Sequence, residues 1–178
     1  MDDIIDLELE KIEKIIAKID SDPESEEVKE AEKHLWEKIY KKSGQGRRTG
    51  VGITAEGDML AAMGLRYGTE EATEFSEQVH KTIALEAYRS SVNMAKERGA
   101  FAIYDSEREK NNPFINRLKE ADPELYEEMK KYGRRNIACL TIAPTGTTSL
   151  MTQTTSGIEP VFMPVSYTHL TLPTTPYV

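Results

Sequence analysis

A short segment rich in threonine, serine and glycine is the part of this sequence best suited to bind an anion. It directly follows an apolar run that ends at Ala143. A buried strand that leads into a small-residue turn and then a helix leaves backbone amides free to face a phosphate, and Gly146 would let that phosphate come close. The candidate phosphate-binding residues are Pro144, Thr145, Gly146, Thr147, Thr148 and Ser149. A threonine-rich helix cap without a ligand is the alternative.

Three other patterns in the sequence bear on nucleotide or anion binding. Gly50-Val51-Gly52 opens like a dinucleotide fingerprint, but the next glycine is Gly57, which is the wrong spacing for Gly-x-Gly-x-x-Gly. The loop after Ala143 lacks the lysine that follows the glycines of a nucleotide-triphosphate P-loop. The pairs Arg47-Arg48 and Arg134-Arg135 precede predicted strands, where they either bind an anion or lie as solvated charges at the strand ends.

The cysteine and histidine residues do not suggest catalysis or metal binding. The single cysteine, Cys139, lies inside the apolar run 137–143, where a free thiol behaves as a small hydrophobic side chain. The histidines, His34, His80 and His169, show no metal-ligand spacing. We therefore assign no catalytic residue and no metal ligand to this chain.

Composition limits the class of protein. The 178 residues include 31 acids and 23 bases, for a formal net charge of −8, and 38% of them are hydrophobic. This predicts a folded chain of about one domain, and the negative charge argues against a nucleic-acid partner. No apolar run reaches the roughly 18 residues of a membrane span, so we expect no membrane partner. The acidic start, Met1-Asp2-Asp3, is unlike a secretion signal, so we expect a cytoplasmic protein.

Helical periodicity dominates the first 130 residues. Isoleucines and a leucine spaced four and three apart between residues 5 and 19 predict an amphipathic helix. A second helix, capped by Asp22, continues to about Lys42, so residues 1–43 should form a helical hairpin. We interpret this hairpin as a scaffold, with a coiled-coil dimer seam as the alternative. Further helices are predicted over residues 54–64 and 69–99, and after Asn112-Pro113 and Asp122-Pro123.

Three segments have the character of strands, namely residues 47–54, 137–143 and 158–162. The run 137–143 is apolar throughout, which is typical of a strand buried on both faces of a parallel sheet. The glycines in 47–54 weaken a strand and indicate a close approach of another backbone.

Three motifs, in their order along the chain, resemble a known family. They are Gly46–Thr54 (Gly-Arg-Arg-Thr-Gly-Val-Gly-Ile-Thr), Arg135–Ile137 leading into Ile142–Thr147 (Ile-Ala-Pro-Thr-Gly-Thr), and Gln153–Phe162 (Gln-Thr-Thr-Ser-Gly-Ile-Glu-Pro-Val-Phe). Together they resemble the large catalytic chain of ribonucleotide reductase, and the residues of the three motifs are most similar to those of the adenosylcobalamin-dependent type. The resemblance covers about residues 1–165.

The resemblance implies an α/β fold, in which this chain is a helix-rich, C-terminal-half fragment of a ten-stranded barrel with the substrate at its centre. It implies an oxidoreductase that makes deoxyribonucleotides for DNA replication by thiyl-radical chemistry, with a cysteine pair supplying electrons. By resemblance, the loop from Pro144 to Ser149 would bind the phosphates of a ribonucleotide substrate. The implied cofactor is adenosylcobalamin, and the implied partners of the full enzyme are a thioredoxin-like reductant and a second copy in a homodimer.

The barrel interpretation makes a spatial prediction. The strands around Val51, Leu140 and Val161 should lie in one sheet. The loop at Gly146 should stand at the C-terminal end of that sheet with unpaired amides.

The sequence departs from the family in two ways. The Asn-x-Cys-x-Glu motif of the radical cysteine and the reducing cysteine pair are both absent. We therefore expect those residues upstream of this part of the enzyme, and we expect the fragment to bind phosphate weakly and to reduce no nucleotide by itself. A reductase barrel of the di-metal-radical type and a non-catalytic helical scaffold are the alternatives.

The last residues form the second departure. Residues 166–178 carry no charge and no helix or strand period. We expect 1–165 to be the reductase fragment and 166–178 to be a foreign or disordered tail that packs on nothing.

Overall fold

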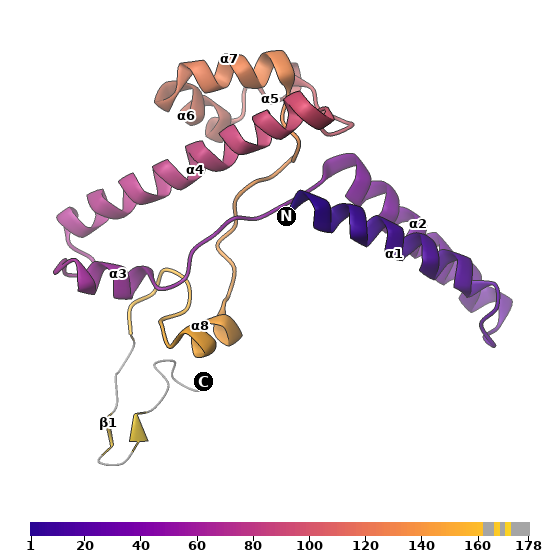
Figure 1. The fold of residues 1–178 in the computed structure, drawn as a ribbon, viewed down its shortest axis with the longest axis horizontal. Helices are drawn as coiled ribbons and strands as arrows, with labels where there is room; N and C mark the ends of the chain where they lie inside the picture. Colours follow the sequence, from indigo (N-terminus) through magenta and orange to yellow (C-terminus); the bar gives the residue numbers. More distant parts are fainter. Residues whose placement is uncertain (162–165, 168–169, 172–178) are drawn as a thin grey trace. The chain divides into compact units, whose positions relative to one another are not determined.

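The computed structural model describes residues 1–161, 166–167 and 170–171, and its regular structure is mostly helical (Figure 1). The chain divides into two compact units. Unit 1 consists of Met1–Thr49 and Leu85–Cys139, and unit 2 consists of Gly50–Ala84 and the residues described from Leu140 onward. The candidate loop therefore belongs to unit 2.

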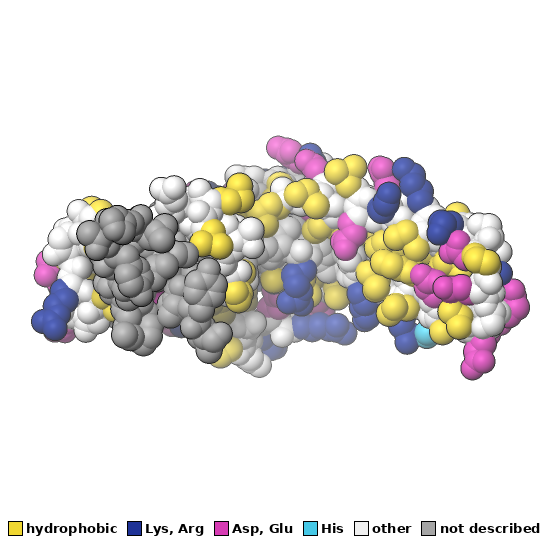
Figure 2. Space-filling model, turned by 90° about the horizontal axis from the view of Figure 1, so that it is seen from below, with side chains coloured by type: hydrophobic (Ala, Val, Ile, Leu, Met, Phe, Trp, Pro, Cys, Tyr) yellow, Lys and Arg dark blue, Asp and Glu magenta, His cyan; other side chains and the backbone are white. Residues whose placement is uncertain are grey.

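Unit 1 begins with a helical hairpin formed by α1 (Asp2–Ile19) and α2 (Glu26–Gly46), which lie side by side (Figure 1). Ile5, Ile12 and Ile19 on α1 are only 8%, 2% and 1% exposed, which confirms the apolar face predicted from their spacing. Other apolar side chains of the hairpin, including Ile4 and Leu7, are exposed. On the face seen at the right of Figure 2, apolar and charged side chains lie next to one another.

The start of α2 differs from the prediction. Ser25, not Asp22, is the N-cap, and its carbonyl accepts a hydrogen bond from the amide of Lys29 at 3.0 Å. Asp22 instead pairs with Lys18 at 3.0 Å across the last turn of α1. Asp22 therefore interacts with the C-terminal end of α1 and does not cap the N-terminus of α2.

The end of α2 also differs, because the helix runs past the predicted end near Lys42 to Gly46, and so includes Gly44 and Gly46. The space beside Gly46 is filled by Ile137, whose Cγ2 would lie 3.3 Å from an added Cβ. Arg47 ends the helix in the left-handed conformation (φ 46°) and is held there by Asp2 and Asp6. These tertiary contacts outweigh the low helix propensity of glycine.

The rest of unit 1 contains the C-terminal half of α4 (Glu70–Arg98), α5 (Ser106–Glu109), α6 (Pro113–Ala121) and α7 (Pro123–Tyr132). The two helix starts predicted at Asx-Pro pairs are confirmed. The side chain of Asn112 accepts the amide of Phe114, and that of Asp122 accepts the amide of Leu125, each at 2.9 Å. The core of this region consists of Tyr88, Val92, Ala95, Phe101, Ile115, Leu118, Leu125 and Met129.

Unit 2 contains α3 (Glu56–Ala62), the N-terminal half of α4 and α8 (Gly146–Thr152). It also contains two short strands, β1 (Ser166–Tyr167) and β2 (Leu170–Thr171), which pair in antiparallel register. None of the helices in the described ranges is long and apolar enough to cross a membrane. The predictions for Phe162 and for most of the tail 166–178 fall outside the described residues.

The predicted strands are reduced to a single parallel bridge between Val51 and Leu140, in which the amide of Thr141 donates to the carbonyl of Val51 at 3.0 Å. Residues 158–161 belong to no strand, so the three-segment sheet is not found in the part of the chain that the structure describes, nor is a barrel. A strand buried in a parallel sheet needs neighbouring strands to pair with and other layers to cover both faces, but Ile142 is 60% exposed. Gly52 does permit the expected close approach, because an added Cβ would lie 2.2 Å from the carbonyl oxygen of Thr141.

Candidate phosphate-binding loop

The loop predicted to bind phosphate leads directly into the short helix α8. Thr145 is the N-cap, with φ −116° and ψ 37°, and its carbonyl accepts the amide of Ser149 at 2.8 Å. The helix ends at Gln153, which adopts a left-handed conformation. The loop begins four residues beyond Leu140, the residue that pairs with Val51, and α8 begins six residues beyond it.

Three consecutive amides of the loop are unpaired. Among the described residues, no acceptor faces the amides of Gly146, Thr147 and Thr148, and all three residues are exposed. An added Cβ at Gly146 would meet nothing within 4 Å. The first amides of a helix have no partner within the helix, so this surface can accept an anion from solvent.

The hydroxyl groups of the loop fall into two sets. The hydroxyl of Thr145 donates to Thr54 Oγ1 at 3.1 Å and accepts the amide of Gly157 at 3.3 Å. The hydroxyl of Ser149, which is buried, donates to the carbonyl of Gly146 at 2.8 Å. Both hydroxyl groups are therefore committed to protein partners, whereas Thr147 and Thr148, like Pro144, are exposed.

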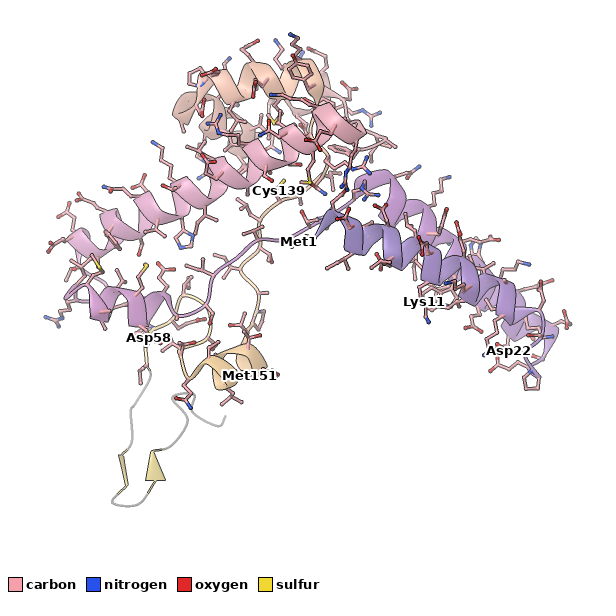
Figure 3. All side chains as sticks on the ribbon, viewed as in Figure 1. Met1, Lys11, Asp22, Asp58, Cys139 and Met151 are labelled. Atoms are coloured by element: carbon pink, nitrogen blue, oxygen red, sulfur yellow. The ribbon has the colours of Figure 1, made fainter. Side chains whose placement is uncertain are left out.

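Two supporting residues, Thr54 and Asp58, were missed as site residues in the sequence analysis. Thr54 Oγ1 donates to the carbonyl of Thr155 at 2.8 Å, and Asp58 accepts the amide of Thr155 at 2.7 Å. Figure 3 labels Asp58 by α3 and Met151 on α8. These contacts join residues about a hundred positions apart, so no local pattern could have revealed them.

The segment after Thr155 packs against α3. An added Cβ at Gly57 would lie 2.5 Å from Pro160 Cα, so a glycine is required at this position of α3. The amide of Glu56 donates to the carbonyl of Gly157 at 3.3 Å. Glu159-Pro160 therefore braces α3.

The arginine pairs considered as anion sites are mostly occupied by protein groups. Arg134, which is 2% exposed, forms a bidentate pair with Glu109 at 2.5 Å, and its guanidinium lies over the ring of Phe101. Arg47 and Arg135 both bind Asp2, at 2.8 and 3.0 Å. They are neither free anion sites nor solvated charges, while Arg48 is exposed.

The carboxyl group of Asp2 illustrates the electrostatics of this cluster. Burial opposes its ionisation, but hydrogen bonds and charge from Arg47 and Arg135 outweigh burial and lower its pKa to about 2. Asp2, Asp3 and Asp6 lie close enough together to hold a cation, but Arg47, Arg98 and Arg135 already neutralise them. We therefore interpret the cluster as structural.

Cys139 and His80 also have defined surroundings. Cys139 is 3% exposed, and burial raises the pKa of its thiol, which is the behaviour expected of a small hydrophobic side chain rather than a nucleophile. His80 Nε2 lies 2.9 Å from Glu56 Oε2, and His34 is exposed on α2. His169 lies outside the described residues.

Comparison with known proteins identifies the family. The profile "Ribonucleotide reductase, barrel domain" matches residues 24–172. The chain therefore belongs to the ribonucleotide reductase barrel-domain family, a family of oxidoreductases, and the resemblance seen in the sequence is confirmed.

Three relatives illustrate the range of similarity. The vitamin B12-dependent ribonucleoside-diphosphate reductase of Thermoplasma acidophilum is 36% identical over 77% of this chain and 16% of the relative. The protein of the same name in Mycobacterium tuberculosis is 35% identical over 65% of this chain and 14% of the relative. The ribonucleoside-diphosphate reductase subunit alpha of Chlamydia pneumoniae is 30% identical over 65% of this chain and 13% of the relative. The chain thus spans about one seventh of the length of these relatives.

Proposed function

We propose that this chain forms part of the ten-stranded barrel of a ribonucleotide reductase, and that the loop from Pro144 to Ser149 binds the phosphates of a ribonucleoside diphosphate. The observation that carries the proposal is the row of unpaired, exposed amides from Gly146 to Thr148. Thr147 and Thr148 add exposed hydroxyl donors, and the open space at Gly146 admits a phosphate oxygen. The names of the relatives supply the substrate class.

The reaction we propose for the complete enzyme replaces the 2′-hydroxyl of the ribose by hydrogen through a thiyl radical. This chain would bind and orient the substrate and would not carry the radical. Its one cysteine is buried, so the radical cysteine and the reducing pair would come from the larger part of the relatives that this chain does not cover. A thioredoxin-like reductant and a homodimer are likewise proposed for the complete enzyme alone.

The cofactor of the complete enzyme is proposed to be adenosylcobalamin, because two of the relatives are named vitamin B12-dependent. A cavity lined by Ile5, Lys42, Arg48 and neighbouring residues holds about 340 Å³, at the small end of the range for drug-sized ligands. We therefore assign no residue of this chain to the cofactor.

The di-metal-radical type remains the second candidate, because the relative from Chlamydia pneumoniae is named subunit alpha without mention of vitamin B12. Assay of the complete enzyme with adenosylcobalamin as the sole radical source separates the two types. A helical scaffold without chemistry is disfavoured by the membership of the chain in a reductase family.

The loop assignment is tested by replacing Gly146 with alanine and titrating the chain with cytidine diphosphate by NMR. The new methyl group meets no protein atom within 4 Å but occupies the space where a phosphate would approach. Gly146→Ala should weaken binding at least about tenfold without loss of stability, because alanine favours a helix over glycine.

The matched control is Gly44→Ala, a helical glycine of unit 1 where an added Cβ makes only an ordinary contact with Leu9 at 3.8 Å. It should leave the affinity unchanged. Equal affinities of the two variants for the nucleotide would contradict the loop assignment.

A further inference from the structure

The N-cap threonine of α8 does not cap its own helix. The side-chain oxygen of an N-cap threonine commonly accepts the amide of the second or third helical residue, here Thr147 or Thr148. Thr145 makes no such bond. Its hydroxyl instead donates to Thr54 Oγ1 at 3.1 Å and accepts the amide of Gly157 at 3.3 Å.

The direction of these hydrogen bonds is fixed. Thr54 uses its single proton on the carbonyl of Thr155, at 2.8 Å, so its oxygen can only accept from Thr145. That carbonyl also accepts the amide of Ala55 at 3.0 Å. The proton of Thr145 is therefore committed away from α8.

The far end of the chain of bonds is anchored as well. Asp58 on α3 accepts the amide of Thr155 at 2.7 Å, so the backbone of Thr155 is held on its amide side as well as its carbonyl side. Thr155 itself is 4% exposed. The position of the Thr54 hydroxyl thus depends on α3 as well as on the loop.

We propose that Thr54, supported by Asp58, is a positioning residue that holds the Thr145 hydroxyl off α8 and so keeps the amides of Thr147 and Thr148 open. The value of those open amides for a nucleotide rests on the proposed function, but the positioning itself does not. Without Thr54, the Thr145 hydroxyl keeps only the bond from the Gly157 amide, at 3.3 Å, and its proton loses its acceptor. The hydroxyl can then turn back and cap α8, where it competes with an anionic ligand.

The test compares Thr54→Val with two matched variants of the full 178-residue chain. Thr54→Ser retains the hydroxyl. Thr155→Val makes the same hydroxyl-to-methyl change at a buried side chain whose Oγ1 has no hydrogen-bond partner in the described part of the chain. Hydrogen exchange of the loop amides without ligand, affinity for inorganic pyrophosphate and a thermal melt are measured for each.

We expect Thr54→Val to slow exchange of the Thr147 or Thr148 amide about fivefold and to weaken pyrophosphate binding by a similar factor. Thr54→Ser and Thr155→Val should stay within about twofold of the parent. General loosening of the loop would speed exchange rather than slow it, so this readout separates positioning from simple destabilisation.

The outcomes distinguish the two proposals. Unchanged or faster exchange in Thr54→Val overturns the positioning role, whatever the affinity of the parent chain. If Thr54→Val fails to fold, Asp58→Asn replaces it, because this change weakens the hydrogen bond that holds Thr155. Slower exchange of the Thr147 or Thr148 amide in Asp58→Asn then supports the positioning role, and unchanged or faster exchange overturns it. Slowed exchange in a chain that binds neither pyrophosphate nor cytidine diphosphate supports the positioning role and rejects the proposed function.

Discussion

At the scale of single residues, the polar groups of this chain are committed to one another to an extent that their sequence pattern does not show. Arg47 and Arg135 meet at Asp2, although Asp2 and Arg135 are 133 positions apart. The side-chain amide of Asn136, a residue that is 1% exposed, donates from Nδ2 to Asp2 Oδ1 at 3.0 Å. Sequence alone indicated which residues carry charge, but it could not indicate which of them meet.

Asp2→Asn should destabilise the chain by about 2 kcal/mol at pH 7. The folded-state pKa of Asp2 is lowered from 3.8 to about 2, so its contribution is fully present above pH 4 and is lost as the pH falls through 2. Urea unfolding at several pH values measures this effect. The free-energy difference between the variant and the parent should shrink as the pH falls from 4 to 2.

Asp3→Asn is the control for that experiment. The Asp3 side chain is 75% exposed and pairs with Arg98 at the surface, where ion pairs contribute little. A cost for Asp3→Asn equal to that of Asp2→Asn would show that general charge balance, and not the buried cluster, sets the stability.

At the scale of elements, local signals predicted the helices well and the strands poorly. The starts at Asn112-Pro113 and Asp122-Pro123 need only the residues beside them, so the sequence suffices. A strand also needs a partner at the right distance, and in the described residues the run 137–143 has only Val51 as a bridge partner, at Leu140. The support of the candidate loop was missed for the same reason, because Thr54 and Asp58 act through Thr155, about a hundred residues away.

Gly52→Ala should disrupt the parallel bridge. Its Cβ would lie 2.2 Å from the backbone carbonyl oxygen of Thr141, which cannot move without breaking the bond from the Thr141 amide to Val51. Overpacking of this kind costs about 1–3 kcal/mol. Urea unfolding measures the loss, and NMR contacts between Val51 and Leu140 report the pairing. Stability equal to that of Gly44→Ala, with the pairing intact, would rule this explanation out.

At the scale of the whole molecule, the chain represents about one seventh of the length of its relatives. Apolar side chains that a complete barrel would be expected to cover are exposed here, among them Ile142 (60%), Leu150 (58%) and Met151 (82%). In the part of the chain that the structure describes, Val51 and Leu140 have no bridge partner but each other, and an unpaired strand edge can pair with another chain.

We therefore expect the isolated chain to self-associate increasingly as its concentration is raised, and to unfold over a broader temperature range than the complete enzyme. Light scattering after size exclusion and a thermal melt measure the two properties. A monomer with one sharp transition would argue that these 178 residues form an independent domain. The complete enzyme, measured in parallel, should show neither behaviour.

The buried thiol of Cys139 has a practical consequence. It is the single sulfhydryl of the chain, and it is closed to solvent in unit 1. An alkylating reagent can therefore modify the folded protein only during transient opening around this position. The rate at which the reagent labels Cys139, measured by mass spectrometry, therefore reports how often this part of unit 1 opens, and no engineered probe is needed.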